Sequence, residues 1–337
     1  MTAPPRLLAR PLAAIPRSTP GAHAAPATGN PRSAVLVIKL GALGDFFMAL
    51  PVMQALRSAH QQDTLSLLTI PSLAPLARAS GLFESVLEDP LGRWPWAHWR
   101  QSRAILRGGY RRVYDLQGNR RSGWYFRLMP ARHRPEWAGP VAGCALPRPP
   151  CPPGAHRTEW YAAQLAALEI DMSPLSDPTW LAAPIAHLGV PERFALIVPG
   201  GSAHRPAKRW PVAHYRILCA ALVARGVVPV LLGTAVDATA CGAIASGVPA
   251  CIDLTGQTSL GAIASLARQA IAAIGNDTGP MHVIASTGCS VVTLYSAESD
   301  PDFVAPLGPH VHCLRRENLA SLEPSDVLAT LDRLGLP

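Results

Sequence analysis

Residues 34–60, AVLVIKLGALGDFFMALPVMQALRSAH, join an apolar run to a helical segment through a turn that contains two glycines and Asp45. The run AVLVIKL predicts a buried strand, and the segment after Asp45 predicts a helix that packs on it. A second strand and glycine turn occur at residues 194–202, FALIVPGGS, and another helical segment follows them. Each stretch therefore predicts the start of a parallel sheet covered by helices.

Further strand-like runs follow each of these stretches. They lie at 64–70, 85–88 and 111–118 in the first half, and at 227–233, 269–274 and 290–296 in the second. A segment with three prolines and no apolar period separates the halves and predicts a linker. We therefore predict an α/β protein of two Rossmann-like domains whose parallel sheets face a central cleft. The predicted parts are a disordered Pro/Ala/Arg-rich tail (1–32), an N-terminal domain (33–173), a linker (174–191) and a C-terminal domain with a terminal helix (192–337).

The composition narrows the class of protein and its compartment. No apolar run in the 337 residues reaches the roughly 18–20 residues that span a bilayer. Prolines interrupt the N-terminal apolar pieces, so we expect no signal peptide. The seven cysteines form no CxxC pair, and most lie in apolar runs. This pattern favours a reducing cytoplasm and argues against a metal site.

The net charge of +8 is unevenly distributed. Residues 93–134 contain eleven arginines and a single acid, Asp115. Such a segment suits an anionic partner such as nucleic acid, an acidic membrane surface or a phosphorylated substrate, although a GC-rich genome also raises arginine content. Four of these arginines have the spacing of one helical face, and three tryptophans come just before them. They are Arg100, Arg103, Arg107 and Arg111, with Trp94, Trp96 and Trp99. The alternative is a solvated face with tryptophans packed inward.

Four polar segments follow predicted strands. They are KLGALGD, PGGSAHRPAKRWP, DLTGQTSL and GNDTGPMH, at residues 39–45, 199–211, 253–260 and 275–282. Ligands of doubly wound folds bind outside the carboxyl ends of the strands. We therefore expect the four segments to line one site.

Asp45 is the chemically active residue of the first segment. It is either an ordinary residue of a helix N-terminus or a carboxylate that faces the cleft as a general base. Gly41 and Gly44 allow a ligand or the other domain to approach the backbone closely.

The second segment has the groups needed to bind a diphosphate. The amides of Gly200 and Gly201, the hydroxyl of Ser202 and the ammonium of Lys208 can together neutralise phosphate oxygens. The alternative is a solvated basic loop. The spacing is not that of a Walker loop.

The third and fourth segments offer groups for a base, a sugar and a phosphate. Thr258 begins a helix, either as a cap or beside a base. Asp277 can accept from sugar hydroxyls, while Thr278 and Gly279 present amides at a helix N-terminus. His282 lies about one turn further on and is either structural or a ligand contact.

These segments, in this order and at these separations, resemble glycosyltransferase family 9, the ADP-heptose:lipopolysaccharide heptosyltransferase family. The resemblance covers roughly residues 34–335 and includes VLVIKLGALGDFFMALPVMQALR, RRVYDLQGNRRSGWYFRL and HRTEWYAAQLAALEI. It implies a GT-B fold and an inverting, metal-independent transfer from ADP-heptose to a Kdo or heptose hydroxyl of a lipopolysaccharide core.

The resemblance also implies residue roles. Asp45 matches the catalytic base, Lys208 and Ser202 match the phosphate contacts, and Thr258 matches a position beside the adenine. The matching donor-binding residues are Asp277, Thr278, Gly279 and His282, together with Gly200 and Gly201. On the acceptor side we expect Gly44, Arg120 and Arg121. One departure concerns the family's glutamate after the strand ending LLG, because here the sequence is GTAVD and the nearest acid is Asp237.

The expected partners are a nucleotide-sugar donor and an anionic glycolipid acceptor. No nucleic acid, metal or other cofactor is expected. A cytoplasmic protein with peripheral contact to the inner-membrane leaflet fits this set. The alternatives are another nucleotide sugar or acceptor, a GT-B epimerase, and a non-catalytic sugar-nucleotide-binding protein.

Overall fold

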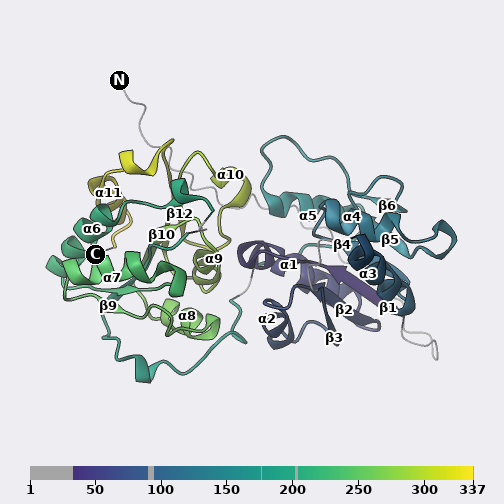
Figure 1. Ribbon diagram of the computed structural model, residues 1–337, viewed down its shortest axis with the longest axis horizontal. Coiled ribbons are helices and arrows are strands. Elements are labelled where there is room, and N and C mark those ends of the chain that lie inside the picture. Colours follow the sequence, from purple (N-terminus) through teal and green to yellow (C-terminus); the bar gives the residue numbers. More distant parts are fainter. Residues whose placement is uncertain (1–32, 90–94, 176, 202–203, 337) are drawn as a thin grey trace.

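Two parallel six-stranded sheets form the framework of the protein (Figure 1). The computed structural model describes residues 33–89, 95–175, 177–201 and 204–336, so the predicted tail at 1–32 lies outside the described residues. Both sheets have the strand order of doubly wound folds, in which the order of the strands reverses next to the first strand of each sheet. The predicted α/β fold with two Rossmann-like domains is confirmed.

The first sheet has the order β3-β2-β1-β4-β5-β6. Its strands are β1 (Ala34–Ile38), β2 (Thr64–Thr69), β3 (Ser85–Glu88), β4 (Arg112–Asp115), β5 (Glu136–Gly139) and β6 (Leu146–Pro147). Its helices are α1 (Leu43–Ala59), α2 (Ala74–Ala79), α3 (Pro95–Arg107), α4 (Arg120–Arg127) and α5 (Arg157–Ala166).

The second sheet has the order β12-β11-β10-β7-β8-β9. Its strands are β7 (Phe194–Val198), β8 (Val228–Leu231), β9 (Ile252–Asp253), β10 (Ala272–Asn276), β11 (Val291–Tyr295) and β12 (Val311–Arg315). Its helices are α6 (Val212–Ala224), α7 (Ala238–Gly247), α8 (Leu260–Ala267), α9 (Gly279–Ser286), α10 (Pro301–Val304) and α11 (Pro324–Arg333).

The apolar sequence of β1 follows from burial on both faces. Val35 and Val37 belong to a core with α1, whereas Leu36 and Ile38 belong to a second core that includes residues of α3 and α4. A strand covered by helices on both sides has no polar face, so its sequence does not alternate.

The two domains meet through α1 and α9, which lie at the centre of the molecule (Figure 1). The contact is tight because glycines stand where the helices approach. A Cβ atom at Gly44 would lie 2.7 Å from the His282 ring, and one at Gly279 would lie 2.9 Å from Leu43. A single apolar core continues from α1 of the first domain to α9 of the second.

A second contact between the domains involves α5 and α10. The Trp160 and Phe303 rings meet edge to face at 5.4 Å, and His156 Nε2 lies 3.0 Å from the carbonyl oxygen of Ala305. In the part of the chain that the structure describes, no helix is long and apolar enough to cross a membrane.

One predicted detail of the basic segment is wrong. Arg111 was expected on the helical face of Arg100, Arg103 and Arg107, but α3 ends at Arg107. Gly108 and Gly109 end the helix, and the Arg111 guanidinium lies near the carboxylates of Asp63 and Glu136 instead. Trp94 lies outside the described residues.

Candidate functional site

The four predicted site segments lie at the carboxyl ends of strands, beside the points where each sheet reverses direction. The first segment follows β1, and the second and fourth follow β7 and β10. The third segment follows the edge strand β9. In each sheet the reversal lies next to the first strand, where neighbouring loops separate and leave room for a ligand.

Asp45 lies in the first turn of α1, where the helix dipole favours a negative charge. One carboxylate oxygen accepts from the Ala42 amide at 3.2 Å. Lys39 Nζ and Arg157 Nε each lie 3.9 Å from the carboxylate, too far for a hydrogen bond but close enough for electrostatic attraction. About a quarter of the Asp45 side chain, 27%, is exposed, so the carboxylate remains accessible.

Lys39 is the first residue of the segment KLGALGD, and the sequence alone does not indicate a role for it. Its side chain is fully buried, and its ammonium has no hydrogen-bond partner among the described residues. Burial lowers the pKa of Lys39 to about 8, although the nearby Asp45 carboxylate acts in the opposite direction. The position of Lys39 directly after β1 does not by itself indicate that its side chain faces Asp45.

A cavity of about 650 Å³ lies in the second domain, against the first turn of α1. This volume is typical of small-molecule sites. Leu43 of α1 forms one wall, two residues before Asp45. Seven residues predicted for the donor line the cavity, namely Gly200, Gly201, Lys208, Thr258, Asp277, Thr278 and Gly279. Ser202 lies outside the described residues.

Lys208 and Asp277 form the charged part of the cavity wall. Their ammonium and carboxylate are 2.7 Å apart, and the Ser299 hydroxyl donates to the same carboxylate oxygen at 2.7 Å. Asp277, which follows β10, therefore fixes the position of Lys208, which follows β7. This contact leaves the ammonium at the wall, where it can meet an anion.

Thr278 occupies the N-cap position of α9, but its hydroxyl makes no capping bond. The backbone amides of the first turn are therefore left without a side-chain acceptor from this residue. Pro280 fits the first turn because it lacks the amide hydrogen that would need a partner. The N-terminus of α9 thus faces the cavity with its positive dipole end.

Asn276 organises the cavity and was missed as a site residue. Its side-chain amide donates to the carbonyl oxygens of Pro199 and Gly200 at 2.8 and 3.0 Å. Its oxygen accepts from the Trp210 amide and the Tyr215 hydroxyl. One buried side chain therefore fixes the glycine turn after β7. The available signal was a polar residue at the end of an apolar strand.

Asp237 lines the cavity beside the glycine turn. It accepts from the Thr234 amide and hydroxyl at 3.0 and 2.9 Å. A Cβ atom at Gly200 would lie 2.8 Å from its carboxylate carbon, so Gly200 is required by close approach. The acid that the sequence left unassigned thus lies with the donor residues.

His282 lies deep in the domain contact, against Gly44. Burial lowers its pKa to about 4, so the imidazole is neutral at pH 7. Gly44, predicted for the acceptor, is thus in contact with the other domain.

Arg120 and Arg121 start α4, close to the end of β4. Arg121 contacts the buried carboxylate of Asp89 and the Tyr125 hydroxyl, whereas Arg120 is exposed. Of the two, Arg120 therefore has the side chain that is open to solvent.

Four large apolar side chains are exposed on α3 and at α4, which pack together. They are Trp96, Trp99, Trp124 and Leu128. The Arg103 guanidinium stacks on Trp99 at 4.6 Å. Trp96 and Trp99 therefore do not pack inward, and the surface combines aromatic rings with positive charge.

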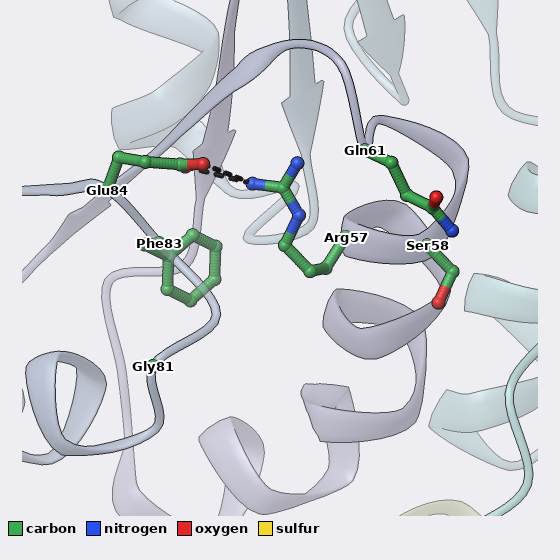
Figure 2. A pocket seen from close by; sticks show the side chains of 6 residues that line it. All are labelled: Arg57, Ser58, Gln61, Gly81, Phe83 and Glu84. Atoms are coloured by element: carbon green, nitrogen blue, oxygen red, sulfur yellow. Dashed lines mark hydrogen bonds and ion pairs between the residues drawn. The ribbon is translucent and has the colours of Figure 1, made fainter.

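Figure 2 shows a second hollow, of about 380 Å³, at the amino ends of β2 and β3. Its charged residues neutralise each other, because Arg57 donates to both carboxylate oxygens of Glu84 at 2.7 and 2.9 Å. The Leu65 amide also donates to Glu84. This end of a parallel sheet is opposite to the one where ligands bind, so the hollow carries no candidate chemistry.

The two Rossmann-like domains, with a cavity at the strand ends of one and a carboxylate at those of the other, define a GT-B protein. A family model described as glycosyltransferase family 9 (heptosyltransferase) matches residues 155–329, and the chain belongs to this family. Asp45 lies outside the matched residues.

Individual relatives agree with this family. The chain is 36% identical to lipopolysaccharide heptosyltransferase 2 of Escherichia coli K12 over 120 residues, which cover 34% of each chain. The match thus spans about a third of the length of this curated relative. The structure of E. coli ADP-heptose lps heptosyltransferase II superposes with a TM-score of 0.69 and 23% identity, covering 89% of this chain and 98% of that one. The structure of E. coli heptosyltransferase WaaC with ADP superposes with a TM-score of 0.70 and 20% identity, covering 89% of this chain and 99% of that one.

Proposed function

We propose that this protein is an inverting glycosyltransferase that moves a heptose from ADP-heptose to a hydroxyl of a lipopolysaccharide core acceptor, either Kdo or heptose. Family membership supports the donor class, and the cavity at the N-terminus of α9 supports a diphosphate there. The observation that carries the proposal is the position of Asp45 in the helical turn that closes this cavity.

Asp45 acts as the general base in this proposal. Its carboxylate takes the proton of the acceptor hydroxyl, and the oxygen attacks the anomeric carbon from the face opposite the diphosphate. The new glycosidic bond forms as the bond to the diphosphate breaks, which inverts the configuration. Lys39 and Arg157 place two positive charges 3.9 Å from the Asp45 carboxylate.

The leaving ADP gains charge as the bond breaks. Lys208 and the amides at the start of α9 meet this charge, while Asp277 and Ser299 hold Lys208 in position. We propose on these grounds that transfer needs no metal ion. Activity in excess EDTA should then equal activity without it, whereas a loss restored by a divalent cation would contradict this part of the proposal.

Thr258, Gly200 and Gly201 complete the donor site around the nucleotide, and Asp237 takes the place of the family's glutamate near it. Gly44, Arg120 and Arg121 are proposed for the acceptor, with Arg120 as the side chain that is open to solvent. His282 holds α9 against α1, so that the base and the donor site act together.

We also propose that the surface of α3 and α4 contacts an anionic membrane leaflet, where a glycolipid acceptor would reside. Exposed tryptophans favour the bilayer interface, and arginines favour anionic headgroups. Such a contact would make the protein peripheral to the cytoplasmic face of the inner membrane.

The direct test is acceptor-dependent release of ADP from ADP-heptose, measured with the wild type and Asp45→Asn. The variant should lower kcat by about 10²–10⁴-fold, because general-base catalysis contributes a factor of this size. Its affinity for ADP should remain within about twofold, since the carboxylate does not touch the diphosphate in this mechanism. Full activity of Asp45→Asn would remove Asp45 as the base. No release from ADP-heptose by the wild type with any core acceptor would overturn the proposed reaction.

A further inference from the structure

Two basic side chains lie beside Asp45, and a third lies next to one of them. Lys39 and Arg157 are each 3.9 Å from the Asp45 carboxylate, and Arg148, which follows β6, shares the Trp160 ring with Arg157. Both guanidinium groups lie against the Trp160 ring of α5, with centroid distances of 4.6 Å for Arg148 and 6.0 Å for Arg157. The three cations thus gather at the end of the first sheet where the acceptor must bind.

Arg148 is a half-buried cation that feels the buried Asp115 carboxylate but forms no ion pair with it. Among the described residues, no carboxylate lies within ion-pairing distance of it, and its guanidinium makes no hydrogen bond to protein. Burial lowers the pKa of Arg148, and the neighbouring Arg157 acts in the same direction. A partly desolvated charge of this kind is costly unless a ligand or partner compensates it.

Arg157 is similarly short of partners. Its closest carboxylate is Asp45, beyond hydrogen-bond distance, and its buried Nε has no acceptor in the described part of the chain. The ring of Phe303 from the other domain lies 4.8 Å from the guanidinium. The residue therefore lies where the two domains and the expected acceptor meet.

Several other arginines of the first domain have carboxylate partners. Arg57 pairs with Glu84, as Figure 2 shows, and Arg112 pairs with Glu136. Arg78 pairs with Glu88 in the same way. Arg148 and Arg157 differ from these paired arginines, because both are partly buried and neither is hydrogen-bonded to a carboxylate of the described residues.

We propose that Arg148 and Arg157, held by Trp160, form a subsite for an anionic group of the acceptor sugar, either a carboxylate or a phosphate monoester. This inference rests on the proposed function and names the chemistry that its acceptor must carry close to the attacking hydroxyl. Guanidinium groups suit both anions because their planar donors form paired hydrogen bonds.

The first test compares Arg148→Gln, Arg157→Gln and Arg148→Lys in steady-state transfer. The two glutamine variants should raise the KM for the acceptor by about 10–100-fold, as expected for lost hydrogen bonds to a charged group. The KM for ADP-heptose should change by less than about twofold, because the arginines do not line the donor cavity. Arg148→Lys should recover part of the acceptor affinity, since it restores the charge without the paired donors.

Arg78→Gln is the matched control, because it removes one positive charge from an exposed ion pair of the same domain. Its acceptor KM should equal that of the wild type. Unchanged acceptor KM values in both Arg148→Gln and Arg157→Gln would overturn the subsite. An equal rise in the donor and acceptor KM values would also overturn it, since that result would indicate general damage to the fold.

A binding measurement separates this inference from the proposed reaction. Calorimetric titrations with free Kdo and with inorganic phosphate are made on full-length protein saturated with ADP, so that the donor site is occupied. The wild type should bind at least one of these anions, and Arg148→Gln should weaken that binding by about tenfold or more. Preference for Kdo identifies a carboxylate, and preference for phosphate identifies a phosphorylated acceptor. Binding of neither anion would overturn the subsite even if transfer is observed, whereas anion binding without transfer would overturn only the proposed reaction.

Discussion

At the scale of single residues, the two lysines of this chain are informative. Of thirty lysines and arginines, only Lys39 and Lys208 are lysines, and both lie in the candidate site. An ammonium is a compact charge that fits where a forked guanidinium would not. Lys208 lies 2.7 Å from Asp277, and Lys39 is enclosed beside Asp45. The choice of lysine in an arginine-rich chain thus coincides with the two points where charge must act in a confined space.

Lys39 should reduce the stability of the protein at neutral pH. Its folded pKa of about 8 is below the unfolded value of 10.5, so the unfolded state binds more protons between these values. The free energy of unfolding should therefore rise as the pH increases from 8 to 10.5. Lys39→Met, which removes the buried charge, should be more stable than the wild type by about 2 kcal/mol at pH 7. Urea denaturation of both proteins at pH 7 and pH 10 measures the difference.

The stability advantage of Lys39→Met should shrink toward pH 10.5, because the folded-state lysine is already neutral there and the unfolded-state lysine is losing its proton. Other groups that titrate in this range are common to the two proteins and cancel in the comparison. The same variant should transfer more slowly, because Asp45 loses the charge at 3.9 Å. An advantage equal at both pH values would contradict the pKa of about 8.

At the scale of helices, the contact of α1 with α9 depends on glycine. Gly44→Ala has an ordinary helical backbone, so its effect comes from the new methyl group, which would lie 2.7 Å from the buried His282 ring. We expect a loss of about 1–3 kcal/mol in the free energy of unfolding, as for overpacked cores. Transfer should fall further than stability predicts, since the methyl group moves the first turn of α1, and with it Asp45, away from the donor cavity.

Gly242→Ala is the matched control for this substitution. Gly242 lies inside α7, and a Cβ atom there would meet nothing within 4 Å. Alanine should stabilise this exposed helical position by about 0.5–1 kcal/mol without changing transfer. Thermal unfolding and ADP release measure both variants. Gly44→Ala with wild-type activity would show that the close approach of the helices is not needed.

The sequence predicted elements with long apolar runs and missed those without them. Strands β1, β7 and β10 are buried on both faces, and their unbroken apolar sequences were recognised. By contrast β6 has two residues, Leu146 and Pro147, and β5 begins with an exposed glutamate, so neither has a local pattern. Short strands of this kind are defined by the strands that they pair with, and a single sequence does not show these neighbours.

At the scale of the whole molecule, the order of the strands explains why four distant segments could be predicted to share a site. Parallel sheets of this order bring loops together at one edge, so a residue that follows a strand end is already placed approximately. What the sequence could not show was which cations lack partners. Arg121 and Arg148 have equal chemistry, yet Arg121 forms an ion pair with the buried Asp89, whereas Arg148 forms no ion pair with any described residue. Such pairing depends on tertiary contacts between segments far apart in the chain.

The whole molecule also has an asymmetric surface, and the proposed membrane contact can be tested there. Arg100, Arg103 and Arg107 lie exposed along α3, with Trp99 beside Arg103 and Trp124 exposed on α4. Replacement of the three arginines by glutamine should weaken binding to phosphatidylglycerol vesicles by about 100-fold, since each arginine near an anionic surface contributes about 1 kcal/mol. Co-sedimentation at constant ionic strength measures this affinity.

The control for vesicle binding removes the same total charge elsewhere. Glutamine at Arg78, Arg193 and Arg315, which are exposed on other elements, lowers the net charge equally but leaves the α3 surface intact. If the contact is local, this control should bind vesicles nearly as well as the wild type, because charges beyond about 10 Å from the headgroups are screened. Trp99→Ala combined with Trp124→Ala should also weaken binding, and its loss should persist at high salt, where the arginine contribution declines. Equal losses in the two arginine triples would indicate that net charge alone attracts the protein, and the α3 surface would then have no special role.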